Sequence, residues 1–246
     1  ACASARECLA KLREQFEPAF EPVMGDHELG KLSMVGRQGG MRLASWHRAV
    51  DELGIKPFWR RDFGRYVLLG ITSSLVGLPL YAPEILPSEA REWEELRNRH
   101  LREIGDVFES LAPDQRVILF SHDPGALPFL AREEAISQRV GQIEQTIIGH
   151  LHSPVIFWKT RWLAGMPRIG FLGNTPRRIT AALREARLWR PFKVRLCPSL
   201  AGIQLFKDGG FLRAELDPDA RQPARFTFRK SPWSEMDRKE ASLTIR

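Results

Sequence analysis

The chain has 246 residues, of which 43% are apolar and 27% are charged, and its net charge is +7. These proportions are typical of a folded globular protein and argue against disorder. No run of about 18 apolar residues occurs, so the sequence predicts no membrane-spanning helix. The length allows one large domain, with or without a small appendage.

The basic charge is compatible with a nucleic-acid partner, a polyanionic substrate or an arginine-rich proteome. The basic residues are scattered along the chain rather than gathered into a nucleic-acid platform, so nucleic acid is a possible partner but not the favoured one. Three cysteines, an odd and sparse set, do not make a disulfide framework. The cysteine usage fits a reducing cytoplasm, and we expect a cytoplasmic location.

The first half of the chain is predicted to alternate helices and strands. Apolar spacing predicts a long helix that follows Ser88 as N-cap, carries a stripe from Trp93 to Leu111 and ends before Pro113. Residues 33–62 have an irregular pattern, apart from one helix. The remaining elements expected here are a helix over 5–16, a strand-like 22–24, a helix near 41–53 and a strand over 66–71.

Two short, wholly apolar strands over 117–120 and 146–148 indicate strands buried on both faces. A further strand is expected over 155–158, and Asn174-Thr175-Pro176 opens a helix that runs to about 189. After Pro191 the pattern is β-rich, with strands over 194–197, 203–206, 211–216 and 226–228. We therefore predict an α/β core over 1–190 and a C-terminal β-rich segment and tail over 191–246, packed on the same domain.

Four of the six histidines directly follow a short apolar strand, in loops that contain glycine. They are His27, His122, His150 and His152. Ligand sites of α/β sheets lie at strand ends, and neutral imidazole is the commonest metal ligand near neutral pH. Asp26 would add an oxygen ligand that suits Mn, Fe or Zn. The plainer alternative is that these are turn histidines at the ends of strands.

The other two histidines, His47 and His100, lie in helical segments and are predicted at surface or half-buried positions. They are not expected to bind a metal. Within Gly149-His150-Leu151-His152, alternate residues of an extended segment share a face, so both imidazoles can point at one metal centre or at two neighbouring centres.

Three of these motifs together resemble the calcineurin-like metallophosphoesterases. In order along the chain, they are Gly25-Asp26-His27-Glu28, then Phe120-Ser121-His122, then Gly149-His150-Leu151-His152. The resemblance covers about residues 1–190. It implies a metallophosphoesterase-type α/β/β/α sandwich that is incomplete at its N-terminus.

The resemblance also implies roles for the site residues. Asp26 stands where the family has a metal-binding asparagine, and His122 and His150 would bind the same metal, whereas His152 would bind a second one. His27 would lie over the scissile phosphate and protonate the leaving oxygen, and Glu28 would orient that loop. In the complete centre two divalent ions are implied, with a metal-bridging hydroxide as the nucleophile.

The sequence departs from the family pattern in two ways. Asp26 adds a negative charge where the family has a neutral amide, which should tighten metal binding and oppose an anionic substrate. The motif Asp-x-His does not occur, and the only Gly-Asp-x-x-Glu string, 105–109, lies within the long helix. We expect the missing motifs upstream of residue 1, and we expect this chain by itself to bind at most one metal well and to be weakly active or inactive.

The sequence thus leads to a hydrolase of phosphomonoesters or phosphodiesters, acting on a phosphorylated small molecule or another phosphodiester. The alternative is a non-catalytic phosphoesterase-like scaffold that binds proteins. The absence of the first two motifs favours the scaffold, and the retention of His27 and the later histidines argues against it. A nucleic-acid phosphodiesterase is the third possibility, suggested by the basic charge.

Overall fold

The computed structural model describes residues 2–16, 20–30, 40–149, 186–198 and 209–230. Several sequence predictions lie outside the described residues. They are His150 and His152, the strands over 155–158 and 203–206, and the start of the helix at Asn174. No helix in the described part of the chain is both long and apolar enough to cross a membrane.

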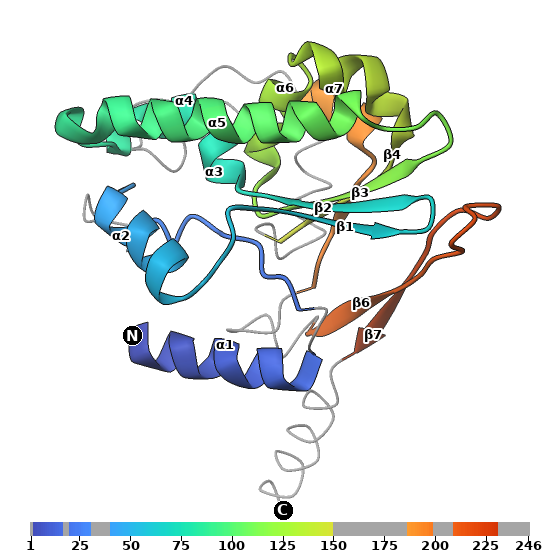
Figure 1. The fold of residues 1–246 in the computed structure, drawn as a ribbon, viewed down its shortest axis with the longest axis horizontal. Coiled ribbons are helices and arrows are strands. Elements are labelled where there is room, and N and C mark those ends of the chain that lie inside the picture. Colours follow the sequence, from blue (N-terminus) through green and yellow to red (C-terminus); the bar gives the residue numbers. More distant parts are fainter. Residues whose placement is uncertain (1, 17–19, 31–39, 150–185, 199–208, 231–246) are drawn as a thin grey trace, which may run out of the picture.

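The centre of the molecule is a mixed five-stranded sheet flanked by helices (Figure 1). Its strands lie in chain order and are mostly parallel, with only the first pair antiparallel. They are β1 (Phe58–Phe63), β2 (Tyr66–Ile71), β3 (Arg116–Ser121), β4 (Ile143–Ile148) and β5 (Val194–Leu196). The α/β class and the strands expected around 66–71, 117–120, 146–148 and 194–197 are confirmed.

Strand β1 lies within the segment that the sequence pattern left irregular, and that prediction was wrong. β1 is an edge strand whose second half is exposed, so it lacks the apolar signature of the central strands. The turn to β2 contains Gly64, whose φ of +57° suits glycine. Trp59 of β1 packs directly over Gly70 of β2 and leaves no room there for a side chain.

One face of the sheet is covered by α5 (Ala90–Glu109), α6 (Leu127–Leu130) and α7 (Glu134–Arg139). The apolar stripe of α5 packs on alternate residues of β2 and β3, among them Leu69 and Leu119. The helix begins later than predicted, because Pro87–Glu89 forms a 3-10 turn and Glu89 stands at the N-cap position without a capping hydrogen bond. The assignment of Ser88 as N-cap was therefore wrong.

The opposite face of the sheet is covered by an antiparallel hairpin of β6 (Gly210–Glu215) and β7 (Arg225–Lys230). Leu212 and Phe226 of the hairpin pack against Ile118 and Ile147 of the sheet. The strands expected over 211–216 and 226–228 are confirmed. The sheet thus carries a layer of helices on one side and a second, smaller layer of strands on the other (Figure 1).

Glu144 of β4 fastens the loop before β7 to the sheet. Its carboxylate, 13% exposed, accepts hydrogen bonds from Arg116 at 2.8 Å, from Tyr66 Oη and from the backbone amide of Ala224. Because Glu144→Ala removes three bonds at once, we expect it to lower the free energy of unfolding by about 1–3 kcal/mol. Chemical denaturation would measure this. Glu134→Ala, at an exposed position on α7, is the control. Equal stability of the two variants would show that Glu144 does not fasten the loop before β7 to the sheet.

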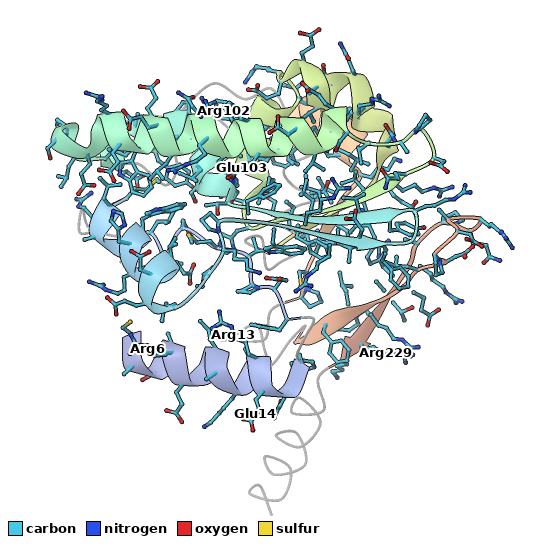
Figure 2. The ribbon with its side chains drawn as sticks, in the orientation of Figure 1. Arg6, Arg13, Glu14, Arg102, Glu103 and Arg229 are labelled. Carbon is cyan, nitrogen blue, oxygen red and sulfur yellow. The ribbon has the colours of Figure 1, made fainter. Side chains whose placement is uncertain are left out.

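The N-terminal part forms a second apolar cluster beside the sheet. Helix α1 (Cys2–Phe16) is attached mainly through polar contacts: Arg6 pairs with Glu52, and Arg13 donates to the carbonyls of Leu53 and Gly54 (Figure 2). The helix predicted near 41–53 is present as α2 (Leu43–His47), which continues as a π-helical turn over Arg48–Glu52. Residues 22–24 are not part of any strand of the described part, so the strand-like prediction there was wrong.

The remaining short helices connect these layers. They are α3 (Ser73–Val76), α4 (Leu78–Tyr81) and the 3-10 turns Ala82–Glu84, Pro124–Ala126, Val140–Gln142 and Ala186–Phe192. The last of these contributes Trp189 and Phe192 to the core beneath the helices.

Candidate metal site at the strand ends

The loop that follows residues 22–24 carries the first candidate residues. It is a tight turn in which the Leu29 amide donates to the Asp26 carbonyl at 3.3 Å and the Gly30 amide donates to the His27 carbonyl at 3.1 Å. The turn places Asp26 inward, at 1% exposure, and leaves His27 and Glu28 exposed.

Glu28 folds back over its own loop. One of its carboxylate oxygens, Oε2, accepts the backbone N–H of Gly25 at 2.9 Å. A side chain at Gly25 would lie 2.8 Å from that oxygen and 3.1 Å from the imidazole of His122. Gly25 therefore permits the close approach of this loop to the end of β3, and Glu28 contacts the backbone of its own loop.

His122 comes directly after β3 and faces Asp26. Its Nε2 lies 3.5 Å from Asp26 Oδ1, and its side chain is 23% exposed, whereas that of Asp26 is 2% exposed. Two residues almost a hundred positions apart are thus brought together because the loop after β3 and the 25–30 loop meet at the carboxyl edge of the sheet.

The end of β4 reaches the same point. Gly149 follows β4, its amide donates to the Ser121 carbonyl at 3.2 Å, and a Cβ at this position would lie 3.4 Å from His122 Nδ1. The imidazole of His122 therefore lies between Asp26 on one side and the backbone that leads directly into His150 on the other. His150 and His152 themselves lie outside the described residues.

The loop after His122 is held by residues that the sequence reading missed. Asp123 donates its amide to Ser73 Oγ at 3.1 Å, and its Oδ1 accepts the Gly125 amide at 2.6 Å. Ser121 Oγ donates to the Asp123 carbonyl at 3.2 Å. The signal available in the sequence was Asp123-Pro124-Gly125, which is a helix N-cap followed by proline at the first helical position.

The separation of Asp26 and His122 suits a shared metal ion. An N···O distance of 3.5 Å is too long for a good hydrogen bond. Two ligands with bonds of about 2.1 Å that meet at a tetrahedral angle are about 3.4 Å apart. The chemistry of the pair, one carboxylate and one imidazole, also fits Mn, Fe or Zn.

This pair is only part of a coordination shell. Among the described residues, no group of three or more histidine, cysteine or acidic side chains is arranged to hold a metal. The two donors that sequence reasoning would add, His150 and His152, are beyond the described part of the chain. Asp26 and His122 are therefore the two donors whose positions the structure describes.

Of the two helical histidines, His100 is not a surface residue. It is 2% exposed, so the prediction of a surface or half-buried position was wrong for it. Its Nε2 accepts the Thr72 amide at 3.1 Å. Burial lowers the pKa of His100, and the nearby Glu103 carboxylate opposes that shift only partly. His47, in contrast, is exposed.

Comparison of the chain with protein-family models, with curated proteins and with solved structures finds no match.

Proposed function

We propose that the chain provides the site of a metal-dependent phosphoester hydrolase, with Asp26, His122, His150 and His152 as metal ligands. The observation that carries the proposal is the 3.5 Å approach of Asp26 Oδ1 to His122 Nε2, with Gly149 against the same imidazole. Motifs far apart in sequence meet at one edge of the sheet. A turn histidine that merely followed β3 would not need to face a buried carboxylate from another loop.

The layer order is also consistent with the resemblance to the calcineurin-like metallophosphoesterases. Helices α5 to α7, the main sheet and the β6–β7 hairpin follow one another, and α1 lies on the same side of the sheet as the hairpin (Figure 1). We propose that these are layers of an α/β/β/α sandwich.

In this proposal each site residue has a separate role. A bound divalent ion would supply Lewis-acid chemistry toward a phosphoryl group. Asp26 and His122 would hold it with a buried carboxylate and an imidazole fixed by the 121–125 loop. His27, exposed beside Asp26, would lie toward a substrate and protonate the leaving oxygen. Glu28 would hold the loop through the Gly25 amide.

The deciding experiment measures metal content and hydrolysis together. After loading with Mn²⁺ or Zn²⁺ and desalting, we expect His122→Ala to bind metal at least about tenfold more weakly than the wild-type chain. Asp26→Ala should do the same, and Asp114→Ala, an exposed carboxylate that pairs with Arg65, should not. Circular dichroism would establish that the variants are folded. Equal metal affinity in His122→Ala and Asp114→Ala would refute the site.

The second candidate is a non-catalytic scaffold of the same fold, favoured by the absence of Asp-x-His from the sequence. Hydrolysis of p-nitrophenyl phosphate and bis-p-nitrophenyl phosphate separates the two. A metal-dependent rate that falls in His27→Ala, with metal content unchanged, supports the hydrolase. Metal binding without any measurable hydrolysis is expected of the scaffold and also of a hydrolase chain without Asp-x-His, so only a measurable rate decides between the two. Steep salt dependence of single-stranded DNA binding would point to a nucleic-acid substrate.

A further inference from the structure

A groove lies between the α2 region and α5, away from the strand-end site. Its volume is about 820 Å³, within the range of small-molecule pockets. None of Asp26, His27, Glu28 and His122 lines it. It therefore requires an explanation separate from the proposed hydrolase.

The floor of the groove is apolar. Trp46, Leu75 and Leu96 are buried at 6%, 1% and 8% exposure, and Val50 and Phe58 are half-buried beside them. Trp46 is fixed edge-on against Trp93 with ring centroids 6.0 Å apart. A rigid aromatic and aliphatic floor of this kind accepts a flat or branched apolar group.

The rim of the groove is acidic although the chain is basic. Four carboxylates line it, against the two guanidinium groups of Arg91 and Arg99, so its formal charge is −2 in a chain of +7. Arg91 is already bonded to one of them, Glu95, at 2.9 Å. Asp51 and Glu92 lie 3.5 and 3.6 Å from the imidazole of His47, which also lines the groove, and Glu103 is the fourth carboxylate. This local excess of negative charge favours a cationic ligand over an anionic one.

A buried polar atom in the wall of the groove adds a hydrogen-bond donor to this charge. His100 accepts the Thr72 amide on Nε2, so in its neutral form the proton is on Nδ1. That Nδ1 is buried and faces the Glu103 carboxylate, but the distance to Glu103 Oε2, 3.7 Å, is longer than that of a normal hydrogen bond. His100 lines the groove, so its N–H is a donor that a ligand oxygen would satisfy.

The N–H that requires a ligand oxygen and the carboxylate that attracts a ligand cation are therefore adjacent. His100 Nδ1–H requires an oxygen, and the Glu103 carboxylate next to it, 45% exposed, attracts an ammonium group. Figure 2 shows Glu103 on α5. A hydroxyl and an amine on neighbouring carbon atoms match this pair, and an apolar group on the same molecule matches the floor.

We propose that this groove binds an amphipathic 1,2-amino alcohol, with its ammonium group at Glu103, its hydroxyl oxygen at His100 Nδ1 and its apolar group on Trp46, Leu75 and Leu96. The proposal is independent of the metal site.

Three matched probes test it by isothermal titration calorimetry on the full chain. 2-Amino-1-phenylethanol carries all three features, 2-phenylethylamine lacks the hydroxyl and 1-phenylethanol lacks the amine. We expect the first to bind about threefold to tenfold more tightly than either of the others. Equal affinity of the three probes, or no heat from 2-amino-1-phenylethanol at millimolar concentration, would overturn the assignment.

A pair of variants on one helix tests the position of the ammonium group. Glu103→Gln should weaken 2-amino-1-phenylethanol about threefold to tenfold and leave 1-phenylethanol unchanged, because only the amine faces the lost charge. Glu109→Gln is the control, since Glu109 is exposed on the same helix but outside the groove. Equal weakening by the two variants would show only a general effect of charge and would contradict a site at Glu103.

Discussion

Replacing Gly70 by alanine is expected to destabilise the folded chain by about 2–3 kcal/mol. A methyl group on Gly70 would overlap atoms of the Trp59 indole. The indole has little freedom to move, since its Nε1 donates to the Pro22 carbonyl at 3.1 Å and its ring packs on Phe120 at a centroid distance of 5.5 Å. Denaturant unfolding followed by tryptophan fluorescence would measure the loss.

The same substitution elsewhere in the chain is the matched control. A methyl group on Gly105, within α5, would meet no atom within 4 Å. Gly105→Ala should therefore stabilise the protein by about 0.5–1 kcal/mol through helix propensity alone. If both variants shifted the unfolding midpoint in the same direction, close packing of Trp59 on Gly70 would be wrong.

The second large effect expected is a loss of stability in mild acid that depends on His100. Burial lowers the pKa of His100 in the folded chain, whereas in the unfolded chain it titrates near 6.5. Above that pH both states are neutral at this residue and its contribution is complete. Below it the unfolded state takes up a proton that the folded state resists, so stability falls by up to about 1.4 kcal/mol per pH unit, until the folded pKa is reached.

The folded state resists protonation of His100 because of two contacts of its ring. Protonating Nε2 would break its bond from the Thr72 amide, and the ring is enclosed by Phe58, whose ring centroid is 6.0 Å away. His100→Gln keeps an acceptor for Thr72 but does not titrate, so its unfolding free energy should change less between pH 7 and pH 5. An identical pH dependence in the wild-type chain and His100→Gln would assign the acid sensitivity to other groups.

The central sheet was predictable because its strands carry unambiguous signals. Residues 66–71, 117–120 and 146–148 are short, almost wholly apolar runs, and the structure places each in a strand between two layers. Strand β1 was missed because half of it is solvated, and its pairing with β2 depends on tertiary contacts such as Trp59 over Gly70. No periodicity in a single sequence reports such a contact.

The candidate site was also predictable only in part. The loop with His122 could be assigned to the carboxyl edge of the sheet because a clear strand precedes it, whereas the loop with Asp26 follows no strand of the described part and reaches the same place through tertiary contacts. Burial of His100 could not be foreseen, because it depends on how α5 lies on the first turn of α3. The acidic groove was likewise hidden, since its residues come from several elements that are far apart in sequence, chiefly the α2 region and α5.

The order of strands in the sheet has a consequence for the rate of folding. Pairing of β1 with β2 closes a turn of only a few residues, so this hairpin can form within microseconds. Pairing of β2 with β3 aligns Tyr66 with Arg116, and it waits until the whole of α5 has been enclosed in the connection. Asp26 and His122 are farther apart still. We therefore expect the strand-end site to be among the last features to form, and a divalent ion that binds there to slow unfolding more than it accelerates folding.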